Sequence, residues 1–416
     1  MIKNLTWYQT LQYLSLLLLA VTIPIGWRYA LWTSILLAIT SLLSLRITYL
    51  KLNAQHSTLN ANHLIILYWL LLLASMLYSD DSTTGWEILK IKAGMLIFPL
   101  AFLLTDRRWI TSRLLRGVGY AFLASMTAVF IYHTSHAVGR ILGGSTFGAA
   151  FGPSFDPRHH AYTALYLAVV LAFVYHELHA HWSELPSWHR GLMFAVVPLM
   201  ILYMIIVNSR AGLLTLYLLE AACTIHFALT RRRWWKAVLM VLLLAGFTFG
   251  AEKALPGHQA RVAATIEDMA SDQPSDARVQ INGSSTEAAF RHPLFGYGVG
   301  DYRHCLVDQY NANDFSAGVS AEYNAHNQYI ETLLAVGLVG MIPFLGMLLL
   351  PLWSAWRRRI GALWLVAMLT GIICFNLLFE SMLERQMGLL FITPLIVIMA
   401  LIVSREKNKF CSKGKS

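Results

Sequence analysis

Residues 328–350 read QYIETLLAVGLVGMIPFLGMLLL, a stretch of 23 residues with one charged side chain, Glu331. A helix needs about 20 mostly apolar residues to cross the hydrocarbon core of a bilayer. This stretch is long enough, and it carries too little charge to be a surface helix in water. It therefore predicts a membrane-spanning helix.

Eleven further runs of the same character lie along the chain, at residues 11–26, 29–47, 63–78, 88–104, 114–133, 161–175, 191–207, 211–229, 234–250, 360–379 and 387–403. Hydrophobic residues make up 57% of the chain and charged residues only 13%, about half the usual share. This composition excludes a soluble enzyme, a disordered chain and a coiled coil. The first run lacks the small-residue cleavage site of a signal peptide, so we expect it to remain as the first of about twelve transmembrane helices.

The distribution of basic residues predicts the orientation of this all-α polytopic membrane protein. If Lys3 is cytoplasmic, 20 of the 32 Lys and Arg residues fall on alternate segments between the runs. Short cytoplasmic loops carry such an excess of positive charge. Both termini are therefore predicted to be cytoplasmic. The net charge of +10 is interpreted as a determinant of topology, not as a site for nucleic acid.

A polar segment at residues 251–322 interrupts the apolar pattern on the outer side, and its length is unusual for a simple connector. Val262, Ile266 and Met269 suggest an amphipathic helix within it. The predicted organisation is helices 1–9 in residues 1–250, a periplasmic loop domain in 251–323, helices 10–12 in 324–404 and a basic cytoplasmic tail in 405–416. A second outer stretch, residues 136–160, is rich in glycine and aromatic residues.

The four cysteines are Cys223, Cys374, Cys305 and Cys411, and they are scattered through apolar runs, the polar segment and the tail. No CxxC pair and no aspartate-rich motif is present, so the sequence predicts no disulfide framework, no metal and no cofactor. The glycines of residues 296–300, GYGVG, follow no predicted strand, which argues against a dinucleotide-binding loop.

Three ionisable residues stand out on the predicted outer side. Arg210 lies in VNSRAG between two runs, Arg278 lies in SDARVQ, and His326 lies in NAHNQY at the mouth of the helix quoted first. Ionisable groups at membrane depth are costly and tend to face functional cavities. A snorkelling arginine and a structural histidine are the alternative interpretations.

These same residues resemble the motifs of the O-antigen ligase family, a relative of the Wzy polymerases. The resemblance rests on Ser209–Arg210, on Arg278 followed by HPLFGYG at residues 292–298, and on HNQY at residues 326–329 with Gly337 and Gly340. It covers the second half of the chain, and the first half matches only in hydropathy.

The resemblance implies a metal-independent, inverting glycosyltransferase of the GT-C type in the bacterial inner membrane, with its active site on the periplasmic face. The donor would be a glycan on undecaprenyl pyrophosphate, and the acceptor the lipid A–core of lipopolysaccharide. Arg210 and Arg278 would hold the pyrophosphate, and His326 would accept a proton from the acceptor hydroxyl. Further candidates for pyrophosphate or sugar binding are Arg158, His159, Arg291, Asn327 and Tyr329.

The sequence is also compatible with other functions. A Wzy-type polymerase and a protein O-oligosaccharyltransferase share this chemistry. A transporter of polysaccharide lipid is more distant, with Lys92, Glu220 and Glu331 as a possible proton path, but the sequence shows no inverted repeat.

Overall fold

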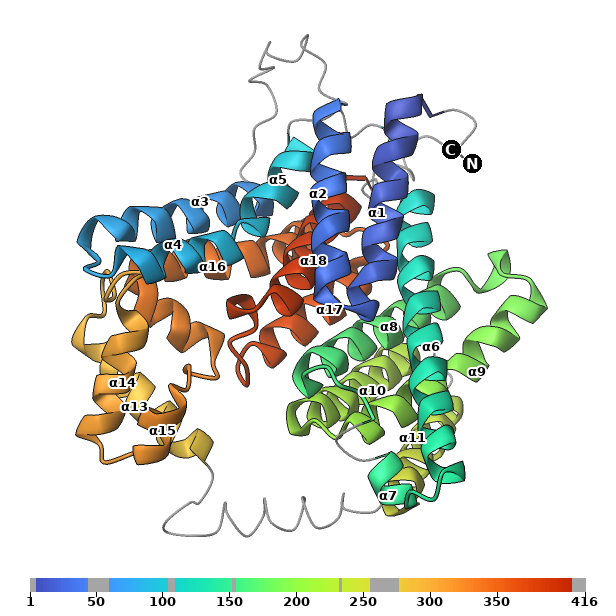
Figure 1. The fold of residues 1–416 in the computed structure, drawn as a ribbon. Helices are drawn as coiled ribbons and strands as arrows, with labels where there is room; N and C mark the ends of the chain where they lie inside the picture. The colour runs from blue at the N-terminus through green and yellow to red at the C-terminus, as the bar shows by residue number, and fades with distance from the viewer. Residues whose placement is uncertain are drawn as a thin grey trace. The chain divides into compact units, whose positions relative to one another are not determined.

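The computed structural model describes residues 5–43, 60–103, 109–151, 155–231, 234–254 and 277–405, and over these ranges its regular structure is all helical (Figure 1). The expected amphipathic segment around residues 262–269 and the basic tail beyond residue 405 lie outside them. In chain order the helices are α1 (Trp7–Ile25), α2 (Trp27–Leu43), α3 (Ala61–Ala74), η3 (Ser75–Tyr78), α4 (Ser82–Ile91), α5 (Gly94–Leu103), α6 (Ser112–Leu142), α7 (Phe147–Ala150), α8 (His160–Ala180), η4 (Trp182–Glu184), α9 (Ser187–Val207), α10 (Arg210–Arg231), α11 (Trp234–Ala254), α13 (Ala277–Arg291), α14 (Tyr302–Ala312), α15 (Ser316–Ala321), α16 (Gln328–Arg358), α17 (Leu363–Asn376), η5 (Met382–Glu384) and α18 (Gln386–Arg405).

The apolar runs form helices suited to a membrane. Within the described ranges, eight helices are long and apolar enough to cross it, and four shorter apolar helices lie at Trp27–Leu43, Gly94–Leu103, Val238–Gly250 and Leu363–Asn376. The polytopic, all-helical prediction is therefore confirmed. The count of about twelve spans, the GT-C assignment and the placement of the loop domain remain predictions.

Two predicted boundaries differ from the structure. The run at residues 88–104 forms two helices, α4 and α5, because the chain turns at Lys92 and places its ammonium beside Glu384. Helix α6 continues to Leu142, into the stretch predicted to be an outer loop, and ends where Gly144 adopts a φ of +93°. The described part of the polar segment, from residue 277, is largely helical and contains α13, α14 and α15.

The chain divides into two compact units. Unit 1 consists of residues 1–121, 276–366 and 377–416, and unit 2 consists of residues 122–275 and 367–376. Helices α6 and α17 each contribute residues to both units.

Polar side chains join the helices of unit 1 within its apolar surroundings. Between α1 and α2, Gln12 Nε2 donates to Ser41 Oγ at 2.9 Å, and Thr22 and Thr33 share a hydrogen bond of 2.8 Å. Figure 1 shows these two helices side by side. Such bonds replace water for polar groups in lipid and fix the register of neighbouring helices. The side chains of Gln12 and Thr22 thus align α1 with α2.

Helix α16 is broken at Gly337, whose φ of +58° and ψ of −159° are not helical. The loop after α13 fills the break. Its Tyr297 and Gly298 N–H groups donate to the carbonyls of Leu334 and Ala335, at 2.8 and 3.1 Å. In return, the N–H groups of Leu338 and Val339 donate to the carbonyls of Pro293 and Leu294, at 2.8 and 3.2 Å. Backbone groups that a broken helix leaves unpaired are thereby satisfied, as they must be at membrane depth.

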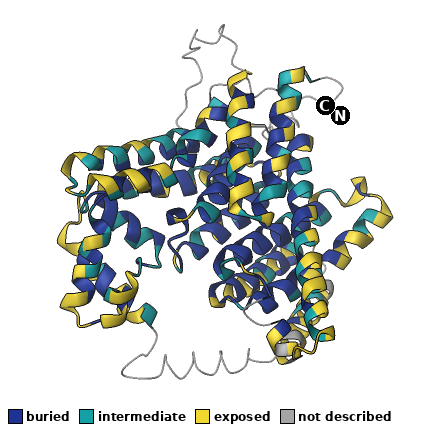
Figure 2. Cartoon of the chain, viewed as in Figure 1, coloured by how far each residue is buried: buried dark blue, intermediate teal, exposed yellow. Residues whose placement is uncertain are grey.

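The core of unit 2 is α8, which is continuously buried from Ala161 to Ala172 (Figure 2). It packs against α9 and α10. Close approach to α10 depends on Gly212, because a Cβ at that position would clash with the Cβ of Ala164. Small residues at such crossings let membrane helices approach closely. Gly212 therefore sets how closely α10 packs on α8.

Candidate active site

His326 lies in a tight loop that leads into α16. Its φ of 44° is in the left-handed region, which costs a non-glycine residue free energy and is often found at functional sites. Its N–H donates to Asn324 Oδ1 at 3.2 Å. The next residue, Asn327, caps α16 by accepting from the N–H groups of Tyr329 and Ile330. These local bonds fix the loop, and the imidazole remains 23% exposed.

Glu380 faces this imidazole from the segment between α17 and α18. Its Oε2 lies 3.4 Å from Nδ1 of His326, and its side chain is only 3% exposed. A carboxylate at Nδ1 favours the tautomer that carries its proton on that nitrogen. The Nε2 atom of His326 is then the proton acceptor, so the pair has the arrangement of a general base and the group that orients it.

A second carboxylate, Glu331, connects the two loops that carry this pair. Its Oε2 accepts one hydrogen bond from the N–H of Ala325 and another from Oγ of Ser381, both at 3.0 Å. Ala325 directly precedes His326, and Ser381 directly follows Glu380. One buried oxygen atom therefore fixes how far apart the imidazole and its carboxylate lie.

A third carboxylate, Glu384, anchors η5. It pairs with Lys92, accepts from the Tyr302 hydroxyl at 2.7 Å and accepts from Arg303 Nη2 at 3.1 Å. Burial alone disfavours the ionised form, but Lys92 and Arg303 outweigh it and lower the pKa of Glu384 to about 2. Lys92 is thus the buried ionic partner of Glu384. The next residue, Arg385, is exposed.

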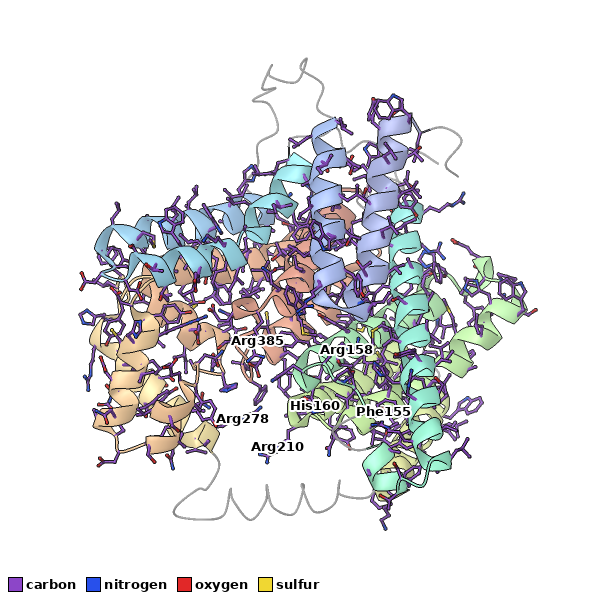
Figure 3. The ribbon with its side chains drawn as sticks, viewed as in Figure 1. Phe155, Arg158, His160, Arg210, Arg278 and Arg385 are labelled. Atoms are coloured by element: carbon purple, nitrogen blue, oxygen red, sulfur yellow. The ribbon has the colours of Figure 1, made fainter. Side chains whose placement is uncertain are left out.

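Arg278 is the second residue of α13 and is partly exposed (Figure 3). The orientation of α13 is fixed at its other end, where the Tyr297 hydroxyl donates to the carbonyl of Ala288 at 3.0 Å. Tyr297 belongs to the loop that fills the break in α16. The HPLFGYG motif therefore has a structural role in unit 1, because it connects the helix of Arg278 to the helix that begins beside His326.

In unit 2, Arg210 is the first residue of α10 and is exposed. Helix α9 ends at Asn208, which has a left-handed φ of 52°. Ser209 Oγ then accepts from the N–H of Gly212 at 3.3 Å. This turn places a guanidinium at the positive end of a helix dipole, where the two charges together favour an anion.

Arg158, also in unit 2, makes a bidentate pair with Asp156, at 2.8 Å from Nε and 2.7 Å from Nη2 (Figure 3). The same carboxylate accepts from the hydroxyls of Tyr203 and Thr163, at 3.0 and 2.9 Å. Burial opposes ionisation, but the bonds from Arg158 lower the pKa of Asp156. His159 packs its ring against Tyr162 at 5.4 Å. Arg158 thus neutralises a buried carboxylate that holds α8 to α9.

The predicted site residues are divided between the units. Unit 1 holds Arg278, Arg291, His326, Asn327 and Tyr329, and unit 2 holds Arg158, His159 and Arg210. Three of the further candidates in unit 1 have local structural contacts. Arg291 pairs with exposed Glu287 at 3.2 Å, Asn327 caps α16, and the ring of Tyr329 packs against Phe344.

The sequence motifs did not mark Glu380 as the partner of His326. The available signal was the segment FESMLER at residues 379–385, which sets two glutamates and an arginine between two apolar runs. Among the described residues, no three His, Cys, Asp or Glu side chains are placed to hold a metal ion.

Comparison with known families identifies one stretch. Residues 195–345 match the family model described as O-antigen ligase, which confirms the resemblance found in the motifs. The matched stretch contains Arg210, Arg278 and His326, whereas Arg158 and His159 lie before it. A comparison with curated proteins found no match.

Proposed function

We propose, from the match of residues 195–345 to the O-antigen ligase family model, that the protein is a glycosyltransferase. It transfers an oligosaccharide or polysaccharide from undecaprenyl pyrophosphate to the lipid A–core of lipopolysaccharide. The reaction takes place on the periplasmic face of the bacterial inner membrane, with both termini in the cytoplasm. It inverts the anomeric centre and uses no metal.

The observation that carries this proposal is the combination of the family match with the His326–Glu380 pair. The match covers all three predicted catalytic residues. The pair supplies a proton acceptor at the start of α16, with its carboxylate 3.4 Å away. General base catalysis by a positioned histidine typically contributes about 10²- to 10⁴-fold to a rate.

In the proposed reaction, Nε2 of His326 takes the proton of the acceptor hydroxyl. The hydroxyl oxygen then forms a bond to the anomeric carbon of the donor sugar, while the bond from that carbon to the pyrophosphate breaks. The electron pair leaves with the pyrophosphate, so negative charge grows on that group. A single displacement of this kind inverts the anomeric centre.

Arginines are suited to stabilise the leaving group. A guanidinium makes bidentate hydrogen bonds to phosphate oxygens. Arg210 and Arg278 are assigned this role, each worth several kcal/mol when it is preorganised in a site that excludes water. Arg385, exposed beside the buried Glu384 network, is a further cation of unit 1 available to the same substrate.

The transporter hypothesis receives less support. Of its proton-path residues, Lys92 is paired with Glu384, and Glu331 accepts two hydrogen bonds that hold the His326 loop in place. Both are therefore engaged in static contacts of unit 1.

The glycans of a deletion strain test the proposal. Loss of a ligase leaves lipopolysaccharide uncapped while full-length polymer accumulates on undecaprenyl pyrophosphate, and a plasmid copy restores capping. Accumulation of single repeat units would instead indicate a polymerase, and loss of glycan from proteins alone would indicate an oligosaccharyltransferase. Unchanged glycans on lipopolysaccharide, undecaprenyl pyrophosphate and proteins would contradict all three assignments: ligase, polymerase and oligosaccharyltransferase.

A further inference from the structure

We propose that Glu380 is a positioning residue that orients His326 for proton transfer, and that Glu331 sets the spacing of this pair. The inference rests on the proposed function, in which Nε2 of His326 accepts the proton of the acceptor hydroxyl.

The geometry of the His326–Glu380 pair supports this role. An imidazole accepts a proton at Nε2 only if the other nitrogen carries its own proton, and a group that binds Nδ1 selects this tautomer. Oε2 of Glu380 lies 3.4 Å from Nδ1. The carboxylate is 3% exposed and the imidazole 23%, so the orienting group is buried while the ring remains open to a substrate.

Hydrogen bonds join the two loops that carry His326 and Glu380. Ala325 and Ser381 each flank one member of the pair, and both donate to Oε2 of Glu331. Around this link, Gln328 Oε1 accepts from the N–H of Leu383 at 2.7 Å, and the N–H of Gln328 donates to the carbonyl of Leu377 at 2.8 Å. The two loops are thus bound to each other on both sides of the histidine and its carboxylate.

The ion pairs of Glu384, which stabilise the fold of unit 1, involve other residues than His326 and Glu380. The buried cation Lys92 and the guanidinium of Arg303 bind a different carboxylate, Glu384. The left-handed conformation of His326 adds to the argument, because such strain persists only where the surrounding structure imposes it. The fold therefore constrains the histidine to face its carboxylate.

Steady-state transfer by purified protein tests the proposal, with undecaprenyl-pyrophosphate-linked polymer as donor and lipid A–core as acceptor. We expect Glu380→Gln to lower kcat by about 10²-fold, within the range of a general base whose orientation is lost. The KM for each substrate should change by less than about threefold, because the proposed role of Glu380 is to orient His326 and not to bind substrate. Glu380→Asp keeps the charge and should retain more activity. Ser381→Ala removes one bond to Glu331 and should cost about fivefold in kcat, the equivalent of a single hydrogen bond.

Chemical rescue distinguishes orientation from mere stability. In Glu380→Ala, added acetate should raise kcat at least tenfold, because it supplies a carboxylate to Nδ1. Acetamide, which has the same shape and no charge, should not. The matched control is Glu87→Ala on α4, an exposed glutamate that should leave kcat unchanged.

Wild-type kcat in Glu380→Gln would overturn the inference. So would a Glu380→Ala variant that acetate and acetamide rescue equally, or neither rescues. His326→Ala separates this failure from failure of the proposed function. If His326→Ala is inactive while Glu380→Gln is normal, only the positioning role is lost. If His326→Ala is itself fully active, the catalytic role of the histidine fails with it.

Discussion

The Nδ1 atom of His326 lies 3.4 Å from Oε2 of Glu380, although 53 residues separate the two in the chain. What brings them together is a third residue, Glu331, which binds the backbone before the histidine and the hydroxyl after the glutamate. The candidate general base is therefore set by the packing of α16 against the segment that precedes α18. A short motif around His326 contains only half of this arrangement.

The break in α16 should depend on glycine at position 337. Its φ of +58° disfavours any residue with a Cβ, and a Cβ there would clash with the Leu294 carbonyl. We expect Gly337→Ala to lower the free energy of unfolding by more than about 2 kcal/mol. Thermal unfolding in detergent measures this. The control is Gly283→Ala on α13, where the added methyl meets open space and should be neutral or stabilising. An equal midpoint for Gly337→Ala and wild type would contradict the account of the break.

The Asp156–Arg158 pair should stabilise unit 2. Asp156→Asn leaves the guanidinium of Arg158 buried without its countercharge, and breaking a buried pair in this way costs about 3 kcal/mol or more. We expect a lower unfolding midpoint and a reduced yield of folded protein, measured by size-exclusion chromatography in detergent. If Asp156→Asn unfolds normally but has lost donor binding, Arg158 acts on substrate and not on the fold.

Glu384 gives unit 1 an acid-sensitive contribution to stability. Its pKa falls from about 4.5 to about 2 on folding, mainly because of Lys92, so the ionised form is favoured in the folded state. The contribution is complete above about pH 4.5 and is lost as the pH falls through about 2, and it amounts to roughly 3 kcal/mol. Wild type should therefore unfold at a higher temperature than Glu384→Gln at pH 7.

The gap between wild type and Glu384→Gln should narrow steadily between pH 4.5 and pH 2. Intrinsic tryptophan fluorescence during heating measures both midpoints across this range. A gap that is the same at pH 2 and pH 7 would show that the charge of Glu384 is not what stabilises η5.

Arg210 and Arg278 are each proposed to stabilise the diphosphate leaving group. We expect Arg210→Ala and Arg278→Ala each to lower the transfer rate by about 10²- to 10³-fold. Arg357→Ala, an exposed arginine at the end of α16, is the control. Wild-type transfer by either folded variant would contradict the role of that arginine at the leaving group.

Much of the fold follows from apolar runs, because a helix buried in lipid needs little beyond length and hydropathy. The break at Gly337 and the turn at Lys92 do not follow, since each depends on a partner far along the chain: the loop after α13 in one case and Glu384 in the other. Motifs identified Arg210, Arg278 and His326. They did not identify Glu380 as the partner of His326, because a carboxylate in a short polar segment has no periodicity or spacing that marks its neighbour in space.

The most direct test of the proposed function is the rate at which purified His326→Ala transfers glycan to lipid A–core from undecaprenyl pyrophosphate. The control is His304→Ala, whose imidazole is 67% exposed and lies beside Asp81. We predict that His326→Ala remains folded and loses at least about 10²-fold in rate, while His304→Ala transfers normally. Transfer by folded His326→Ala at the wild-type rate would contradict the central claim.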